Sequence, residues 1–228
     1  MDLTPKDIRW IFIYLFVLLI SVALHELGHA IMADKLGDDT PRRQGRVTLN
    51  PLAHADPIGT FLLPLVSSVY AAVSGGLGGG FGWGKPVEWQ PHRIGRTVSM
   101  STAKVLVAIA GPAMNIILAT AVACASAILV ATHVIRLESE VFAILLFAVQ
   151  VNFVLFFFNL LPVPPLDGGH VAQSFTPYRH REKFDAFARY SPFIILALML
   201  TPQMRVVFTW PATFLTDHLY GVLGVRLL

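Results

Sequence analysis

The stretch "SVALHELGHAIMA", residues 21–33, closes a long apolar run and contains the pattern His-Glu-x-x-His. On an α-helix, His25 and His29 lie on one face, one turn apart, and can bind the same metal ion. Glu26 lies about 100° further round such a helix, where it can take a proton from a metal-activated water without being a ligand. Charged side chains are costly inside a membrane and usually have a function there. The motif therefore predicts a zinc site, with Glu26 as the general base.

The composition is that of a membrane protein. Of the 228 residues, 55% are hydrophobic and only 14% are charged, and the mean hydropathy is +0.64. Soluble domains contain about 25% charged residues, so an ordinary soluble domain is excluded. The apolar runs leave no space for a separate soluble domain between them. We therefore expect residues 1–228 to form a single membrane-embedded domain.

Apolar runs long enough for a membrane-spanning helix, about 20 residues, predict the fold. They are residues 8–33, 105–132 and 141–161. A C-terminal stretch, residues 191–228, is interrupted at Pro202 and Pro211, and predicts either one span with an interfacial helix or two short spans. The expected fold is an all-α polytopic membrane protein with a three-helix catalytic core and an additional C-terminal helix or helices.

A shorter apolar run, residues 57–73, precedes "GGLGGGFGWG", residues 75–84, where seven of ten residues are glycine and a helix is disfavoured. If residues 57–73 cross the membrane, the Lys and Arg residues up to residue 189 divide 10 to 5 between the two sides; if they turn back, the division is 12 to 3. The positive-inside rule favours the second arrangement, with the basic segments in the cytoplasm. Residues 45–90 are therefore expected to contain a re-entrant segment and a small β element near the active site.

A catalytic zinc ion usually has three protein ligands and one open position. The best source of the third ligand is "NLLPVPPLDGGH", residues 159–170, at the end of the third span. Its prolines end the helix, so we expect Asp167 on a turn made possible by Gly168 and Gly169. His170 is the alternative ligand, but it lies further from the apolar region. The sequence therefore favours Asp167.

Three motifs now indicate a family. "HELGHA" (residues 25–30), "AGPAMN" (residues 110–115) and "NLLPVPPLDGG" (residues 159–169) resemble the site-2 protease family of intramembrane zinc metalloproteases. "GRVTLNPLAHADPIGT" (residues 45–60) and "GWGKPVEWQP" (residues 82–91) resemble segments of a compact subgroup. The short loop between the second and third spans leaves no space for a PDZ domain, and we expect no nucleotide-binding regulatory domain after the last span.

The resemblance implies a specific enzyme. It implies one zinc ion per chain held by His25, His29 and Asp167, with Glu26 as the general base, and hydrolysis of peptide bonds within transmembrane segments. The implied partners are single-span membrane protein substrates and the lipid bilayer, with no nucleic acid. The implied location is a bacterial or archaeal cell membrane, with the active site towards the cytoplasm.

Two other functions compete with a protease. A membrane metal transporter or metal-binding protein is expected to show ligands along a path to both faces, whereas the candidates here gather at one. A non-proteolytic relative acting as a membrane chaperone would not need Glu26. The sequence gives no indication of oligomeric state.

Three further polar residues are weaker candidates for substrate or oxyanion binding. Asn115, within a span, is expected to contact either a neighbouring helix or the substrate. Asn159 matches the asparagine that the family carries eight residues before the aspartate, and can bind the substrate backbone or the oxyanion. His54 either contacts substrate or belongs to a polar turn. An extended substrate could add as a strand to a sheet around residues 45–52 and 81–89.

Overall fold

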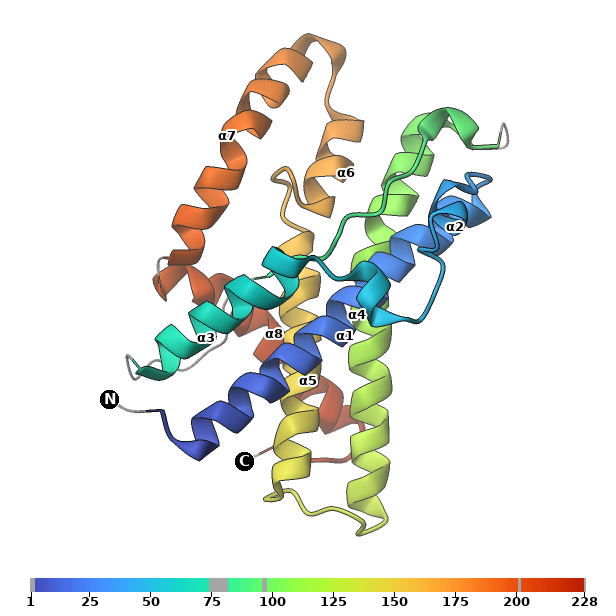
Figure 1. The fold of residues 1–228 in the computed structure, drawn as a ribbon. Helices are drawn as coiled ribbons and strands as arrows, with labels where there is room; N and C mark the ends of the chain where they lie inside the picture. The colour runs from blue at the N-terminus through green and yellow to red at the C-terminus, as the bar shows by residue number, and fades with distance from the viewer. Residues whose placement is uncertain (1–2, 74–81, 96–97, 201, 228) are drawn as a thin grey trace.

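The computed structural model describes residues 3–73, 82–95, 98–200 and 202–227 (Figure 1). The α-helices are α1 (Pro5–Lys35), α2 (Thr40–Arg43), α3 (Leu63–Val73), α4 (Met100–Ala131), α5 (Glu140–Asn159), α6 (Asp167–Phe175), α7 (Arg181–Leu200) and α8 (Pro202–Val222). The short helices are the 3₁₀ turns η1 (Pro51–His54), η3 (Pro91–Arg93) and η4 (Tyr178–His180), and the π-helical η2 (Pro57–Leu62). The all-α fold class is therefore confirmed for the described part of the chain.

Helices α1, α4 and α5 are long and apolar enough to cross a membrane. Their bounds lie within five residues of the predicted spans. Each begins at a side-chain cap. Ser99 accepts a hydrogen bond from the Thr102 amide and Ser139 from the Phe142 amide, which satisfies N–H groups that a helix start leaves free.

Helices α4 and α5 stand side by side and α1 crosses them diagonally (Figure 1), and α4 packs against both α1 and α5. It runs antiparallel to α5, to which residues 132–139 connect it. Gly28 permits the close approach of α1, since a Cβ at this position would lie 2.5 Å from the Ala110 carbonyl oxygen. As a result, the C-terminal parts of α1 and α5 meet the N-terminal part of α4 at one end of the core.

The C-terminal region differs from the prediction of helices beginning near residue 191. Helix α7 begins at Arg181 because polar residues 181–190 also form helix, although a search for apolar runs omits them. Pro211 lies inside α8 and does not end it. Helix α8 packs against α5 and α4, where the Ser126 and Tyr220 hydroxyls lie 2.7 Å apart in a buried contact.

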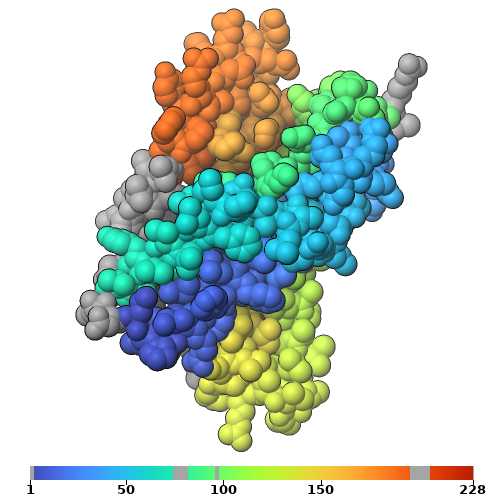
Figure 2. All heavy atoms as spheres, viewed as in Figure 1, coloured from blue at the N-terminus to red at the C-terminus, as the bar shows by residue number. Residues whose placement is uncertain are grey.

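The chain before the predicted re-entrant segment lies next to the chain that follows it. Helix α3 packs against α1 and lies beside it across one face of the molecule (Figure 2). Before this excursion, the His54 carbonyl accepts a hydrogen bond from the Lys85 amide at 2.8 Å. The Thr60 hydroxyl donates to the Trp83 carbonyl at 2.8 Å. These contacts are compatible with a re-entrant segment, and whether residues 57–73 enter a membrane and turn back stays a prediction.

The predicted small β element is reduced to one feature in the described residues, an isolated antiparallel bridge between Ala55 and Gly84. Residues 82–90 continue from it as extended chain rather than as a strand of a sheet. Most of the glycine run lies within residues 74–81, which are outside the described residues. Its predicted lack of helix can be compared with the structure only at residues 82–84, which are not helical.

Candidate metal centre and catalytic site

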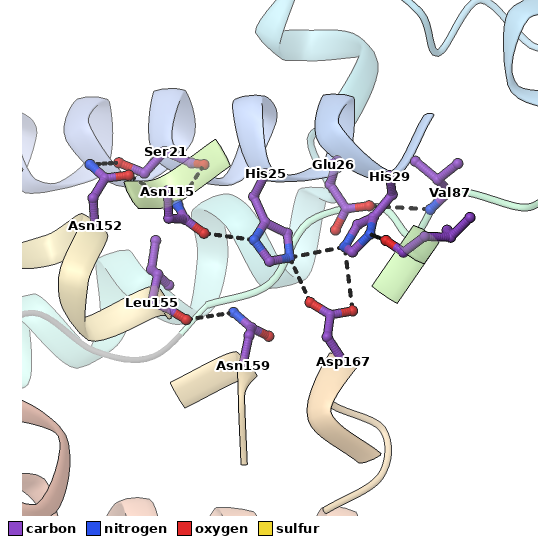
Figure 3. A network of polar contacts seen from close by, with 11 residues as sticks. Ser21, His25, Glu26, His29, Val87, Asn115, Asn152, Leu155, Asn159 and Asp167 are labelled. Atoms are coloured by element: carbon purple, nitrogen blue, oxygen red, sulfur yellow. Dashed lines mark hydrogen bonds and ion pairs between the residues drawn. The ribbon is translucent and has the colours of Figure 1, made fainter. Parts of the chain in front are cut away.

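Three buried or half-buried side chains converge where the ends of the long helices meet (Figure 3). Nε2 of His25 lies 3.1 Å from Oδ2 of Asp167, and Nε2 of His29 lies 3.3 Å from Oδ1. The two Nε2 atoms are 3.1 Å apart. The histidines are on α1 and the aspartate is on α6, so the structure brings together the three residues that the sequence suggested as zinc ligands.

The hydrogen bond made by Nδ1 of each imidazole determines whether Nε2 can act as a metal ligand. Nδ1 of His25 lies 2.7 Å from Oδ1 of Asn115, and Nδ1 of His29 lies 2.7 Å from the Val107 carbonyl oxygen. Both neighbours are acceptors, so both Nδ1 atoms donate, and each neutral ring directs the lone pair of Nε2 towards Asp167.

This arrangement fits a metal cation. When both rings are neutral, the two Nε2 atoms and the carboxylate are all acceptors, and no hydrogen lies between Oδ2 of Asp167 and the imidazoles. Acceptors at such short separations repel one another unless a positive charge lies between them. The donor set, two imidazoles and one carboxylate, is that of catalytic zinc sites.

The spacing and the free space also suit zinc. Ligand atoms about 2.0–2.1 Å from a tetrahedral ion are about 3.3 Å apart, close to the observed 3.1–3.3 Å. Gly111 of α4 lies against the cluster, and a Cβ there would be 2.3 Å from Nε2 of His29. Any larger residue at this position would push the two imidazole rings away from Asp167.

Asp167 reaches the site from a helix start, not from the predicted turn. It is the first residue of α6, and neither following glycine has a positive φ. These glycines serve for packing instead. A Cβ at Gly168 would lie 2.3 Å from the Leu160 carbonyl oxygen, and one at Gly169 would lie 2.4 Å from the Pro164 nitrogen. Close packing of the start of α6 on residues 160–164, together with packing of α6 against α4, therefore places Asp167 opposite the histidines.

Glu26 lies beside the cluster and is held by the main chain. Its Oε2 accepts a hydrogen bond from the Val87 amide at 3.2 Å. Gly84 allows this extended chain to approach, since a Cβ there would lie 3.0 Å from Cγ of Glu26 and 2.6 Å from Cγ1 of Val22. The hydrogen bond fixes one carboxylate oxygen and leaves the second available.

A buried polar network behind His25 was only partly predicted. Asn115 is 0% exposed, and its Nδ2 donates to Oδ1 of Asn152 at 3.0 Å. Asn152 in turn donates to the Ser21 hydroxyl at 3.0 Å. The prediction that Asn115 contacts a neighbouring helix agrees with this geometry. Sequence reasoning missed Ser21 and Asn152, whose only signal was a polar residue within an apolar helix.

The remaining candidates take different positions. Asn159, the last residue of α5, donates to the Leu155 carbonyl at 2.9 Å, and its oxygen is turned towards the side of Asp167 (Figure 3). His54 is buried; its Nε2 lies 3.0 Å from the Thr48 carbonyl oxygen, and its Nδ1 has no hydrogen-bond partner among the described residues. His170, the alternative ligand, is exposed on α6.

An apolar helical core that buries a His-Glu-x-x-His motif and a third carboxylate is the arrangement of a membrane metalloprotease. Comparison with known proteins agrees, since residues 125–202 match Peptidase family M50. Over 203 residues the chain is 38% identical to a Bacillus subtilis protein named "Putative zinc metalloprotease YwhC", covering 85% of this chain and 82% of that protein. It is 30% identical over 208 residues to the Mycolicibacterium smegmatis protein named "Putative zinc metalloprotease Rip2", covering 89% and 73%. No solved structure matches.

The chain therefore belongs to peptidase family M50, the site-2 protease family that the three motifs indicated. It is a membrane protein and a metalloprotease, and its metal is zinc.

Proposed function

We propose that this protein is an intramembrane protease that hydrolyses peptide bonds within transmembrane segments of single-span membrane proteins, as in regulated intramembrane proteolysis. The observation that carries the proposal is the position of His25, Glu26 and His29 inside α1, a 31-residue helix that is apolar enough to cross a membrane. Ionisable groups inside such a helix are costly and usually have a function there, so we expect them to act on peptide bonds at membrane depth.

The chemistry follows from the groups that the chain supplies. His25, His29 and Asp167 would hold one zinc ion, which, when bound, polarises the scissile carbonyl and activates water. Glu26 takes a proton from the attacking water with its free oxygen and returns it to the leaving amine. Asn159 is placed to bind the substrate backbone or the developing oxyanion.

A substrate helix must unwind before its amide groups can react, because in a helix they are hydrogen-bonded internally. Residues 84–90 pass beside Glu26, and an unwound substrate would pair with the backbone groups of Val87, Glu88 and Trp89 that other described parts of the chain do not bind. Photo-crosslinking from a bound substrate is expected to mark these residues. Crosslinks confined to α7 and α8 would exclude this mode of binding.

The charge distribution supports a multi-pass protein with its active site towards the cytoplasm. The basic segments before α3, before α4 and after α5 lie at the end of the core where His25, His29 and Asp167 meet. We place this end in the cytoplasm of a bacterial or archaeal cell.

Co-expression with a panel of single-span membrane proteins tests the proposal. The wild-type chain is expected to convert at least one of them into a shorter product, and Glu26→Gln is expected to abolish this product. Exposed Glu138→Gln is the matched control and should cleave like the wild type. Altered abundance of a partner without cleavage, equal in wild type and Glu26→Gln, would instead indicate a membrane chaperone.

A further inference from the structure

Arg46 is a buried cation without a carboxylate partner. It is 4% exposed, and its guanidinium donates to the main-chain carbonyls of Ala53, Lys85 and Pro86, the last at 2.8 Å. Within the described residues, no carboxylate lies at ion-pair distance from it. Three main-chain carbonyls are therefore the hydrogen-bond partners of the buried guanidinium, and this binding holds residues 85–86 in place.

The segment held by Arg46 is extended and has a second buried charge at its far end. The Asp38 carboxylate, on a residue that is 0% exposed, accepts a hydrogen bond from the Gln90 amide. Residues 85–90 have no regular secondary structure. Two buried side chains of opposite charge therefore fix this segment through its backbone groups.

The contact with Pro86 links Arg46 to the catalytic glutamate. The Pro86 carbonyl and the Val87 amide belong to one planar peptide unit, and in a trans peptide they point in opposite directions. Arg46 binds the carbonyl side of this unit, and Glu26 accepts a hydrogen bond from the amide side. A donor on the carbonyl fixes the plane and also polarises the N–H that faces Glu26.

We propose that Arg46 is a positioning residue for Glu26, which acts by fixing the peptide unit between Pro86 and Val87 so that its N–H orients the catalytic carboxylate. This inference rests on the proposed role of Glu26 as the general base. The motif of residues 45–60 contains neither a proposed metal ligand nor the general base, and this inference gives its Arg46 a role in catalysis.

Steady-state cleavage of a short unfolded peptide in detergent, measured with zinc content, tests this role. Arg46→Gln is expected to retain zinc and to lower kcat by roughly 10- to 100-fold, with KM changed by no more than about threefold, because the base is misoriented while the peptide still binds. Arg46→Lys, which keeps the charge but cannot reach three carbonyls, should fall between Arg46→Gln and the wild type. Arg42→Gln is the matched control, since Arg42 is 65% exposed at its side chain and pairs with Asp34; its kcat should equal that of the wild type.

Val87→Pro tests the same peptide unit without removing a buried charge. It deletes the N–H that donates to Glu26, and residues 85–90 form no helix or strand that a proline would interrupt. Its kcat should fall as in Arg46→Gln, and combining the two substitutions should add little, because both remove one interaction.

Three results would overturn the inference: a Val87→Pro variant with wild-type kcat, an Arg46→Gln variant equal to Arg42→Gln, or a loss of activity that only follows loss of zinc. A wild-type enzyme without any peptidase activity would instead overturn the proposed function, and the inference with it.

Discussion

Nδ1 of His25 lies 2.7 Å from Oδ1 of Asn115, a buried residue of α4. The amide group of Asn115 donates to Asn152 on α5, so its oxygen is the atom that faces the imidazole. One hydrogen-bonded chain therefore joins three long helices and determines which nitrogen of His25 faces the metal site. Such partners of metal ligands fix the tautomer and orientation of the ring.

We expect Asn115→Leu to weaken zinc binding by about 10- to 100-fold, because His25 loses the acceptor that orients it. Competition against a chelator would measure the change. Ser126→Ala is the control, since Ser126 is buried in the same helix but contacts Tyr220. Unchanged zinc affinity in Asn115→Leu would show that the network does not support the site.

The choice of third ligand is tested by comparing Asp167→Asn with His170→Ala. Asp167 faces both histidines, whereas His170 is exposed. We expect Asp167→Asn to reduce zinc content and cleavage together, because an amide is a poorer zinc ligand than a carboxylate. His170→Ala should retain both. The reverse result would make His170 the ligand.

Asp38 should contribute a pH-dependent part of the stability. Burial disfavours its ionised form, but hydrogen bonds from the Gln90 and Thr40 amides and from the Thr40 hydroxyl hold its pKa below the usual value. A lowered folded-state pKa means that the stabilisation is full above the unfolded pKa of about 3.9 and disappears as the pH falls through the folded value. The wild type should therefore melt at a higher temperature than Asp38→Asn at pH 7, and the difference should shrink below about pH 4.

Thermal unfolding in detergent from pH 7 to pH 3 measures this difference. Exposed Asp217→Asn controls for loss of a carboxylate elsewhere. A difference between wild type and Asp38→Asn that stayed constant over the whole range would show that the charge of Asp38 does not stabilise the fold.

The topology is tested by labelling single cysteines in a Cys124→Ser background. Gln44, Arg93, Arg181 and Glu138 are exposed. The first three lie next to α2, before α4 and at the start of α7, and these segments are at the opposite end of the core from the loop between α4 and α5 that contains Glu138 (Figure 1). Cysteines at the first three positions should react from the cytoplasm, and one at Glu138 from the other side. Labelling of positions 44 and 93 from different sides would mean that Pro57–Val73 crosses the membrane.

The sequence was most informative where local geometry sets the chemistry. The four-residue separation of His25 and His29 fixes their common face on any helix, and long apolar runs predicted the three core helices to within a few residues. Asp167 could be selected because both motifs fall at the same end of their spans. Its position at a helix start could not, because Gly168 and Gly169 are read equally well as a turn or as a packing contact.

Contacts between distant segments were beyond prediction from the sequence. Asn152 and Ser21 are isolated polar residues in apolar helices, and no periodicity relates them to Asn115. From the sequence, Arg46 is one of several basic residues in a loop. Only the structure shows that it is buried against residues 85–86. Helix α7 starts with a polar stretch that a membrane-span search passes over.

The central claim is that a zinc ion held by His25, His29 and Asp167 acts together with Glu26 as the proton acceptor. The most direct measurement is zinc content and peptide cleavage on the same purified samples of wild type and Glu26→Gln. The account predicts about one zinc ion per chain in both, with cleavage only in the wild type, because the ligands persist while the proton acceptor is gone. Cleavage that survives in Glu26→Gln, or zinc that is lost with the activity, would contradict it.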